Sequence, residues 1–110
     1  MTVPLNTTQF VRWSEEATSP TVDALTATLV AEGFSPQLLT DSPDEDYGWH
    51  HHETAQMLLV VMGSMDVRIR TERFSMQAGD RLYLAPHEEH AATVGPEGVT
   101  YFDVARQLRT

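Results

Sequence analysis

Glycine and proline interrupt the chain so often after residue 35 that only short regular elements fit between them. Short apolar runs bounded by such residues are typical of β-strands. We predict eight strands and therefore a sandwich or a barrel. The predicted strands cover residues 37–40, 49–53, 56–62, 65–70, 73–76, 81–85, 90–94 and 99–105.

One segment before the strands, residues 18–33, has the pattern of a helix. Ser19 can cap it, Pro20 suits its first turn, and Gly33 is a natural stop. Three apolar residues share one face of this helix. We expect that face, made of Val22, Leu25 and Leu29, to pack against the outside of the barrel.

The run Met57 to Met62 is apolar at every position and does not alternate as a half-exposed strand would. Such a strand is buried on both faces. A second subunit could cover its outer face, and a buried central strand within one chain explains the run equally well.

The length of 110 residues suits one domain with one core. We predict a single domain over residues 1–110, with a strand and helix extension over 1–35 and a barrel core over about 36–106. Any metal must be bound by histidine, carboxylate or amide groups, because the chain has no cysteine.

The charge of the chain restricts its partners. The formal net charge is −9, and the seven basic residues are arginines spread along the chain. Clustered positive charge would be needed to bind nucleic acid or an anionic membrane, so we expect a small-molecule partner instead. Neither a signal peptide nor a run of about 18 apolar residues is present, and we predict a cytoplasmic protein.

All five histidines lie between residues 50 and 90. Side chains alternate along a strand, so His50 and His52 point to one face and His51 to the other. If the strand stays regular through Thr54, the same parity brings Gln56 to that face. His90 must then arrive from another strand. Such a group can bind a metal, but a histidine triplet can also be an exposed turn, and paired histidines can be satisfied by hydrogen bonds alone.

Residues 48–63 read GWHHHETAQMLLVVMG, and residues 79–90 read GDRLYLAPHEEH. The first segment resembles the first motif of the cupin superfamily, with His50, His52, Gln56 and Gly63 in register. The second resembles the second cupin motif, with matches at Gly79, Asp80 and His90. Together with the strands around them, the motifs extend the resemblance over roughly residues 45–105.

Three positions depart from the cupin pattern. Gln56 stands at the position of the acidic ligand, Asp44 at that of an early glycine, and the Pro-x-Gly turn reads Ala-Pro-His over residues 85–87. Gln56 could ligate weakly through its oxygen, hydrogen-bond a bound water or substrate, or fill the barrel as a neutral polar residue.

The resemblance implies an all-β fold: a single cupin or jelly-roll β-barrel with one N-terminal α-helix packed outside. It also implies a divalent transition metal, with iron, nickel or zinc preferred and manganese, cobalt or copper as alternatives. The implied metal ligands are His50, His52, Gln56 and His90.

Three functions are compatible with the resemblance, and one of them is a structural or storage barrel whose histidines are remnants. The first is a metal-dependent enzyme, such as a three-histidine oxygenase, isomerase or lyase, acting on a small organic molecule inside the barrel. The second is a non-enzymatic cupin that binds or senses a sugar or other metabolite. A homodimer is expected, because cupins often pair. No catalytic residue can be assigned.

Other polar residues receive structural roles. Asp80 follows Gly79 at the start of a strand and is expected to cap that turn. His87, Glu88 and Glu89 precede His90 in a loop at the mouth of the barrel, where solvation is a simpler explanation than acid or base catalysis.

Overall fold

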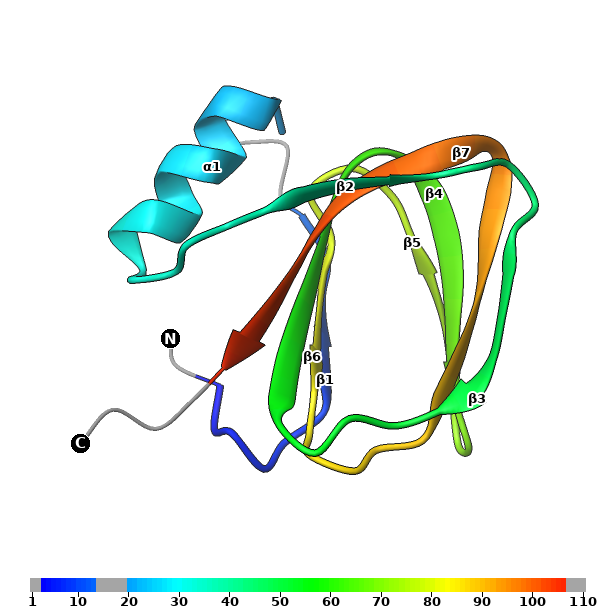
Figure 1. Ribbon diagram of the computed structural model, residues 1–110. Coiled ribbons are helices and arrows are strands. Elements are labelled where there is room, and N and C mark those ends of the chain that lie inside the picture. Colours follow the sequence, from blue (N-terminus) through cyan, green and yellow to red (C-terminus); the bar gives the residue numbers. More distant parts are fainter. Residues whose placement is uncertain (1–2, 14–19, 107–110) are drawn as a thin grey trace.

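The computed structural model describes residues 3–13 and 20–106, which form seven strands and one helix (Figure 1). No helix in these two segments is long and apolar enough to cross a membrane. The elements in chain order are β1 (Gln9–Val11), α1 (Val22–Ala31), β2 (Leu38–Asp41), β3 (Asp46–His50), β4 (Ala55–Ile69), β5 (Arg73–Met76), β6 (Arg81–Leu84) and β7 (His90–Arg106).

The strands form one antiparallel sheet with the order β1-β6-β4-β7-β2, in which β3 also pairs with β7 and β5 with β4. The long strands β4 and β7 pair along most of their length and curve around the interior (Figure 1). The all-β barrel with one helix is thus confirmed. Two pairs of predicted strands, 56–62 with 65–70 and 90–94 with 99–105, are wrong as separate elements. The chain continues through irregular positions within β4 and β7 instead. The strand predicted over residues 49–53 is also displaced, because β3 covers Asp46–His50.

The outer face of β4 is covered by the helix. Leu25 and Leu29 of α1 are fully buried and belong to one cluster with Met57, Leu59 and Val61. The alternating residues of β4 belong to a second cluster inside the barrel, which contains Leu58, Val60, Met65 and Val67. One chain therefore covers both faces of the run from Met57 to Val61, as the buried central strand predicts, whereas Met62 is 56% exposed.

The helix begins later than predicted. Its N-cap is Thr21, whose Oγ1 accepts a hydrogen bond from the Ala24 amide at 3.2 Å. Ser19, the predicted cap, lies outside the described residues. The predicted stop at Gly33 is close to the observed end, since Gly33 follows the helix with a φ of 95°.

Gly63 lies where β4 bends, between two shifts in its register with β7. Its φ is +76°, and a Cβ atom there would lie 2.0 Å from the carbonyl oxygen of Gly98. Because both backbones would have to move, we expect Gly63→Ala to lower the free energy of unfolding by about 2 kcal/mol or more. Urea denaturation measures this. Gly48→Ala is the control, since no atom lies within 4 Å of its added Cβ. Equal stability of the two variants would contradict this explanation.

Asp80 is 2% exposed, and its carboxylate joins the N-terminal segment to the turn before β6. It accepts hydrogen bonds from the backbone amides of Trp13 at 2.8 Å and Gln77 at 2.9 Å, and it pairs with Arg12 at 3.4 Å. The expected turn role is therefore confirmed.

We expect Asp80→Ala to lower the free energy of unfolding by about 2–4 kcal/mol, because it removes the acceptor from two amides. Asp80→Asn keeps one acceptor oxygen and should lose about half as much. Chemical denaturation of both variants checks this order, and an alanine variant as stable as the parent would refute it.

Candidate metal centre

Three histidines meet at one end of the barrel. His50 is the last residue of β3, His90 is the first residue of β7 and its cross-strand partner, and His52 lies in the segment that leads to β4. One potential ligand nitrogen from each ring lies within 4.8 Å of the others. The ring centres are 4.2 Å apart for His50 and His90, 5.1 Å for His50 and His52, and 5.4 Å for His52 and His90. The structure thus brings together the three residues expected from strand parity and from the second motif.

Burial increases from one ring to the next. His50 is exposed, His52 is partly buried, and His90 is only 6% exposed. The group therefore reaches from the barrel interior to solvent on the side of β3, and a small molecule or an ion can approach it from there.

Backbone carbonyls orient two of the rings. His50 Nδ1 lies 2.7 Å from the Gly48 oxygen, and His90 Nδ1 lies 2.9 Å from the Glu88 oxygen. A carbonyl oxygen only accepts, so Nδ1 carries the proton in both rings and Nε2 keeps a free lone pair. This is the arrangement by which proteins orient metal-binding histidines.

Burial lowers the pKa of His90, and the neighbouring His50 and His52 lower it further, against the opposing effect of the Glu88 carbonyl. His90 is therefore neutral near pH 7, which is the form that binds metals.

The lowered pKa of His90 has a consequence for the stability of the metal-free protein. Below about pH 6.5, the usual pKa of histidine, the unfolded chain protonates this ring while the folded chain resists protonation. We therefore expect the free energy of unfolding in EDTA to fall as the pH drops below about 6.5. Urea titrations between pH 5 and 8 measure it. His90→Gln should show a smaller decrease over this range, and an identical pH dependence would contradict the assignment.

Asp103 is a further polar residue of the barrel interior, and it was not among the predicted site residues. Its cross-strand partner is Leu58, a residue of the interior cluster, so the carboxyl group points into the barrel. Burial raises the pKa of Asp103, while the charges of His52 and His50 lower it. One signal could have revealed it: Val99, Tyr101 and Asp103 alternate along a strand whose inward positions are otherwise occupied by apolar and aromatic residues.

The Gln56 side chain also faces the barrel interior, but for a reason other than the one predicted. The strand does not stay regular through Thr54, because β3 ends at His50 and β4 begins at Ala55. Within β4, however, Gln56 pairs with Leu84, a residue of the interior cluster. Its side chain therefore faces inward, and its role as a ligand stays a prediction.

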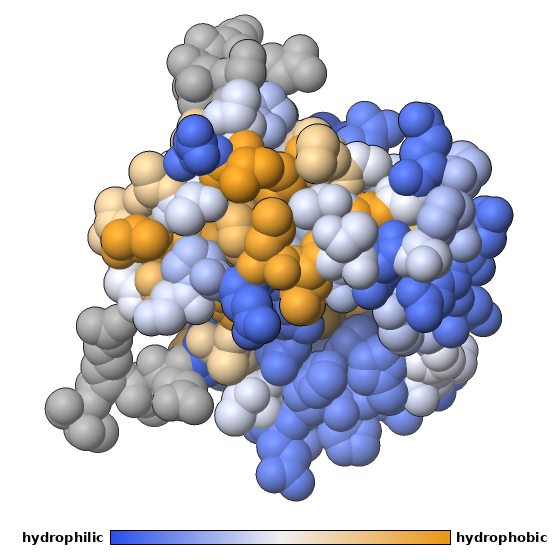
Figure 2. Space-filling view, turned by 45° about the horizontal axis from the view of Figure 1, so that its top comes forward, coloured by the Kyte–Doolittle hydropathy of each residue, from blue (hydrophilic) through white to orange (hydrophobic). Residues whose placement is uncertain are grey.

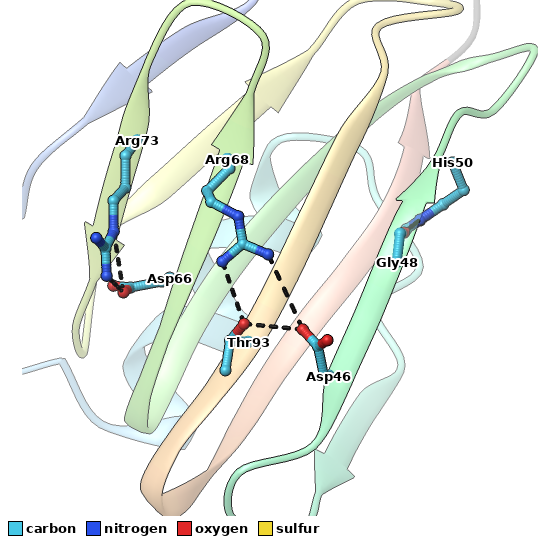
Figure 3. A network of polar contacts seen from close by, with 7 residues as sticks. All are labelled: Asp46, Gly48, His50, Asp66, Arg68, Arg73 and Thr93. Atoms are coloured by element: carbon cyan, nitrogen blue, oxygen red, sulfur yellow. Dashed lines mark hydrogen bonds and ion pairs between the residues drawn. The ribbon is translucent and has the colours of Figure 1, made fainter.

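Contacts on the outside hold the exposed strand β3 in place. The Thr93 hydroxyl donates to Asp46 at 2.9 Å and accepts from Arg68 at 3.2 Å, which links β3, β7 and β4 (Figure 3). Arg70 lies 4.0 Å from the centre of the Trp49 ring and donates to Glu89 at 3.2 Å. Since Trp49 precedes His50 and Glu89 precedes His90, this arginine connects the two segments that carry those histidines.

The remaining histidines lie apart from this group. The rings of His51 and His87 face each other with centres 5.8 Å apart. The amide of His87 donates to the carbonyl of His52 at 2.7 Å, which ties the loop before β7 to the segment before β4. The predicted alternation does not explain this arrangement, because β3 ends at His50 and residues 51–52 lie outside any strand.

Comparison with known proteins identifies the family. The chain matches the AraC-like ligand binding domain over residues 38–105, well over half of its length, and belongs to that family. No curated protein matches it. The architecture is that of the cupin superfamily, as the similar solved structures show.

Three solved structures illustrate this similarity. An RmlC-like cupin from Shewanella frigidimarina NCIMB 400 is 25% identical, with 66% of this chain and 64% of that chain covered and a TM-score of 0.58. A cupin superfamily protein from Desulfitobacterium hafniense DCB-2 is 10% identical, with 96% and 82% covered and a TM-score of 0.59. The Fe(II) form of HppE in complex with substrate is 17% identical, with 64% and 44% covered and a TM-score of 0.57.

Proposed function

We propose that the protein binds one divalent transition metal ion through His50, His52 and His90 and acts on a small organic molecule beside it. The observation that carries this proposal is the three-histidine group, with its potential ligand nitrogens within 4.8 Å of one another and two of its rings oriented by backbone carbonyls. Nitrogen ligands suit iron, nickel or zinc better than magnesium or calcium. HppE, which shares the fold, was solved with Fe(II) and a substrate.

Asp103 favours proton transfer as the chemistry at this site. A bound metal ion would polarise a carbonyl or hydroxyl oxygen of the substrate. The carboxyl group of Asp103 faces into the barrel, where it would accept a proton from the substrate and return it elsewhere. Among the classes that the cupin resemblance implies, isomerases and lyases depend on such a step. Gln56, also facing inward, can hydrogen-bond a substrate without adding charge.

A second candidate is binding without turnover. The family model describes a ligand-binding domain, which supports a role in sensing or carrying a small molecule. The same residues would then orient the ligand, and Asp103 would act only as a hydrogen-bonding group.

Elemental analysis of protein purified without chelators tests the metal part of the proposal. We expect close to one transition metal ion per chain. Protein that contains far less, and that cannot be loaded with iron, nickel or zinc, would refute it. Exchange of substrate hydrogen for deuterium in D2O, followed by NMR over a panel of small hydroxy acids, keto acids and sugars, then separates the two candidates. Only the enzyme exchanges hydrogen at catalytic rates.

The homodimer and the cytoplasmic location stay predictions. Figure 2 shows apolar side chains gathered on the face that carries α1 and β2. Val30, Leu38 and Met62 are exposed, by 57%, 43% and 56%. An apolar surface of this kind supports the pairing of two chains, which light scattering over a range of protein concentrations would measure.

A further inference from the structure

His51 and His87 form a second pair of imidazoles that shares no residue with the three-histidine group. Both side chains are exposed. Their ring centres are 5.8 Å apart, only slightly farther than the 4.2–5.4 Å found within the three-histidine group. A tetrahedral ion about 2 Å from one nitrogen of each ring holds the ring centres about 5 to 6 Å apart. The pair therefore has the spacing that one shared ion requires.

The backbone conformation and hydrogen bonds around His87 help to position this pair. His87 has a φ of +66°, a left-handed conformation that costs free energy for any residue other than glycine. The amide of His87 donates to the carbonyl of His52 at 2.7 Å, and the amide of Glu88 donates to Ala85 at 3.2 Å. The first bond joins the loop before β7 to the segment that carries His51, and the second closes the turn over residues 85–88. The two ring planes are inclined at 53° to each other.

The chemistry of the pair limits the ion. Two neutral imidazoles favour zinc, nickel or copper over magnesium or calcium. Two protein ligands leave the other positions to water or to a small anion, so binding must be weaker than at a three-histidine centre. The net charge of −9 raises the concentration of cations near the protein and favours occupancy of an exposed site.

We propose that His51 and His87 form an outer site for a divalent transition metal ion at the mouth of the barrel. It is separate from the three-histidine centre and binds the ion less tightly. The two sites are neighbours in the chain, since His51 lies between His50 and His52 and His87 lies three residues before His90.

Titration of the chelator-treated protein with Zn²⁺, in competition with a chromophoric indicator, tests this site. We expect two classes of binding, with the weaker one at least tenfold weaker. His51→Ala and His87→Ala should each remove only the weaker class, and His90→Ala only the tighter one. His87→Asn serves as a second variant, because asparagine tolerates the positive φ and keeps the loop conformation. Circular dichroism confirms folding of each variant.

NMR of the imidazole nitrogens in the His90→Ala variant provides an independent readout. The signals of His51 and His87 should shift together, at the same Zn²⁺ concentration. A single class of sites in the parent protein, survival of the weaker class in either alanine variant, or independent shifts of the two rings would each overturn the proposal.

Discussion

His52→Ala should reduce the affinity for Zn²⁺ at the tighter site by more than about 100-fold, and His90→Ala should do the same. Loss of a residue that merely orients a ligand costs about 10- to 100-fold in metal affinity, so loss of a ligand should cost more. Competition titrations of the chelator-treated protein measure the effect. His52 is the cleaner test, because it is only partly buried, whereas truncating the buried His90 also leaves a small cavity.

His51→Ala is the matched control for this experiment. It removes an imidazole from the adjacent position, but one that faces His87 and not the three-histidine group. The tighter site should keep its affinity within about threefold in this variant. A His52→Ala protein that binds one ion as tightly as the parent would show that the three rings do not form the metal centre.

Asp103→Asn should keep the bound metal and lose about 10²- to 10⁴-fold in the rate of substrate hydrogen exchange. This is the usual contribution of a positioned acid or base, and asparagine keeps the shape of the side chain without its proton-accepting oxygen. Metal content and exchange in D2O are measured on the same sample, so that loss of the ion is distinguished from loss of catalysis.

Asp41→Asn provides the comparison for this variant. Asp41 of β2 is a partly buried carboxylate of the same barrel, and it accepts a hydrogen bond from the Tyr101 hydroxyl at 2.8 Å. Its replacement should leave exchange within a few-fold of the parent rate. If Asp103→Asn exchanges hydrogen as fast as the parent, the carboxyl group is not the base. If it loses the metal, the residue is a ligand.

Much of the fold could be read from local signals. Glycine and proline lie close to the ends of β2 and β6, and the apolar run in β4 indicates burial on both faces. The same signals mislead at Gly63 and Gly98, which were treated as breaks between strands. There the chain bends through positive φ values while β4 and β7 continue. Whether a glycine ends a strand or bends it depends on the partner strand, and a single sequence does not contain that information.

The sequence predicted those site residues whose type and spacing both indicate a metal centre. His50, His52 and His90 stood out because histidines are few and the two motifs lie in order. Asp103 did not, because its alternation with Val99 and Tyr101 shows a shared face but not whether that face points inward. The register of β7 against β4 pairs Asp103 with Leu58 and so places its side chain on the inner face of the barrel. For Gln56 the inward-facing side chain was predicted on the assumption of one continuous strand from His50 to Gln56. The structure interrupts that strand between His50 and Ala55, yet the side chain still faces inward.

Strand β3 has a property that bears on how the centre is assembled. All five of its residues are exposed, and its ladder is to β7 alone. Elements with so little buried surface open locally long before the whole protein unfolds. An ion shared between His50 and His90 would cross-link the end of β3 to the start of β7 and stabilise the pairing of these two strands. Metal binding would then be coupled to the pairing of β3 with β7. Amide hydrogen exchange in β3 would become slower once the metal is bound.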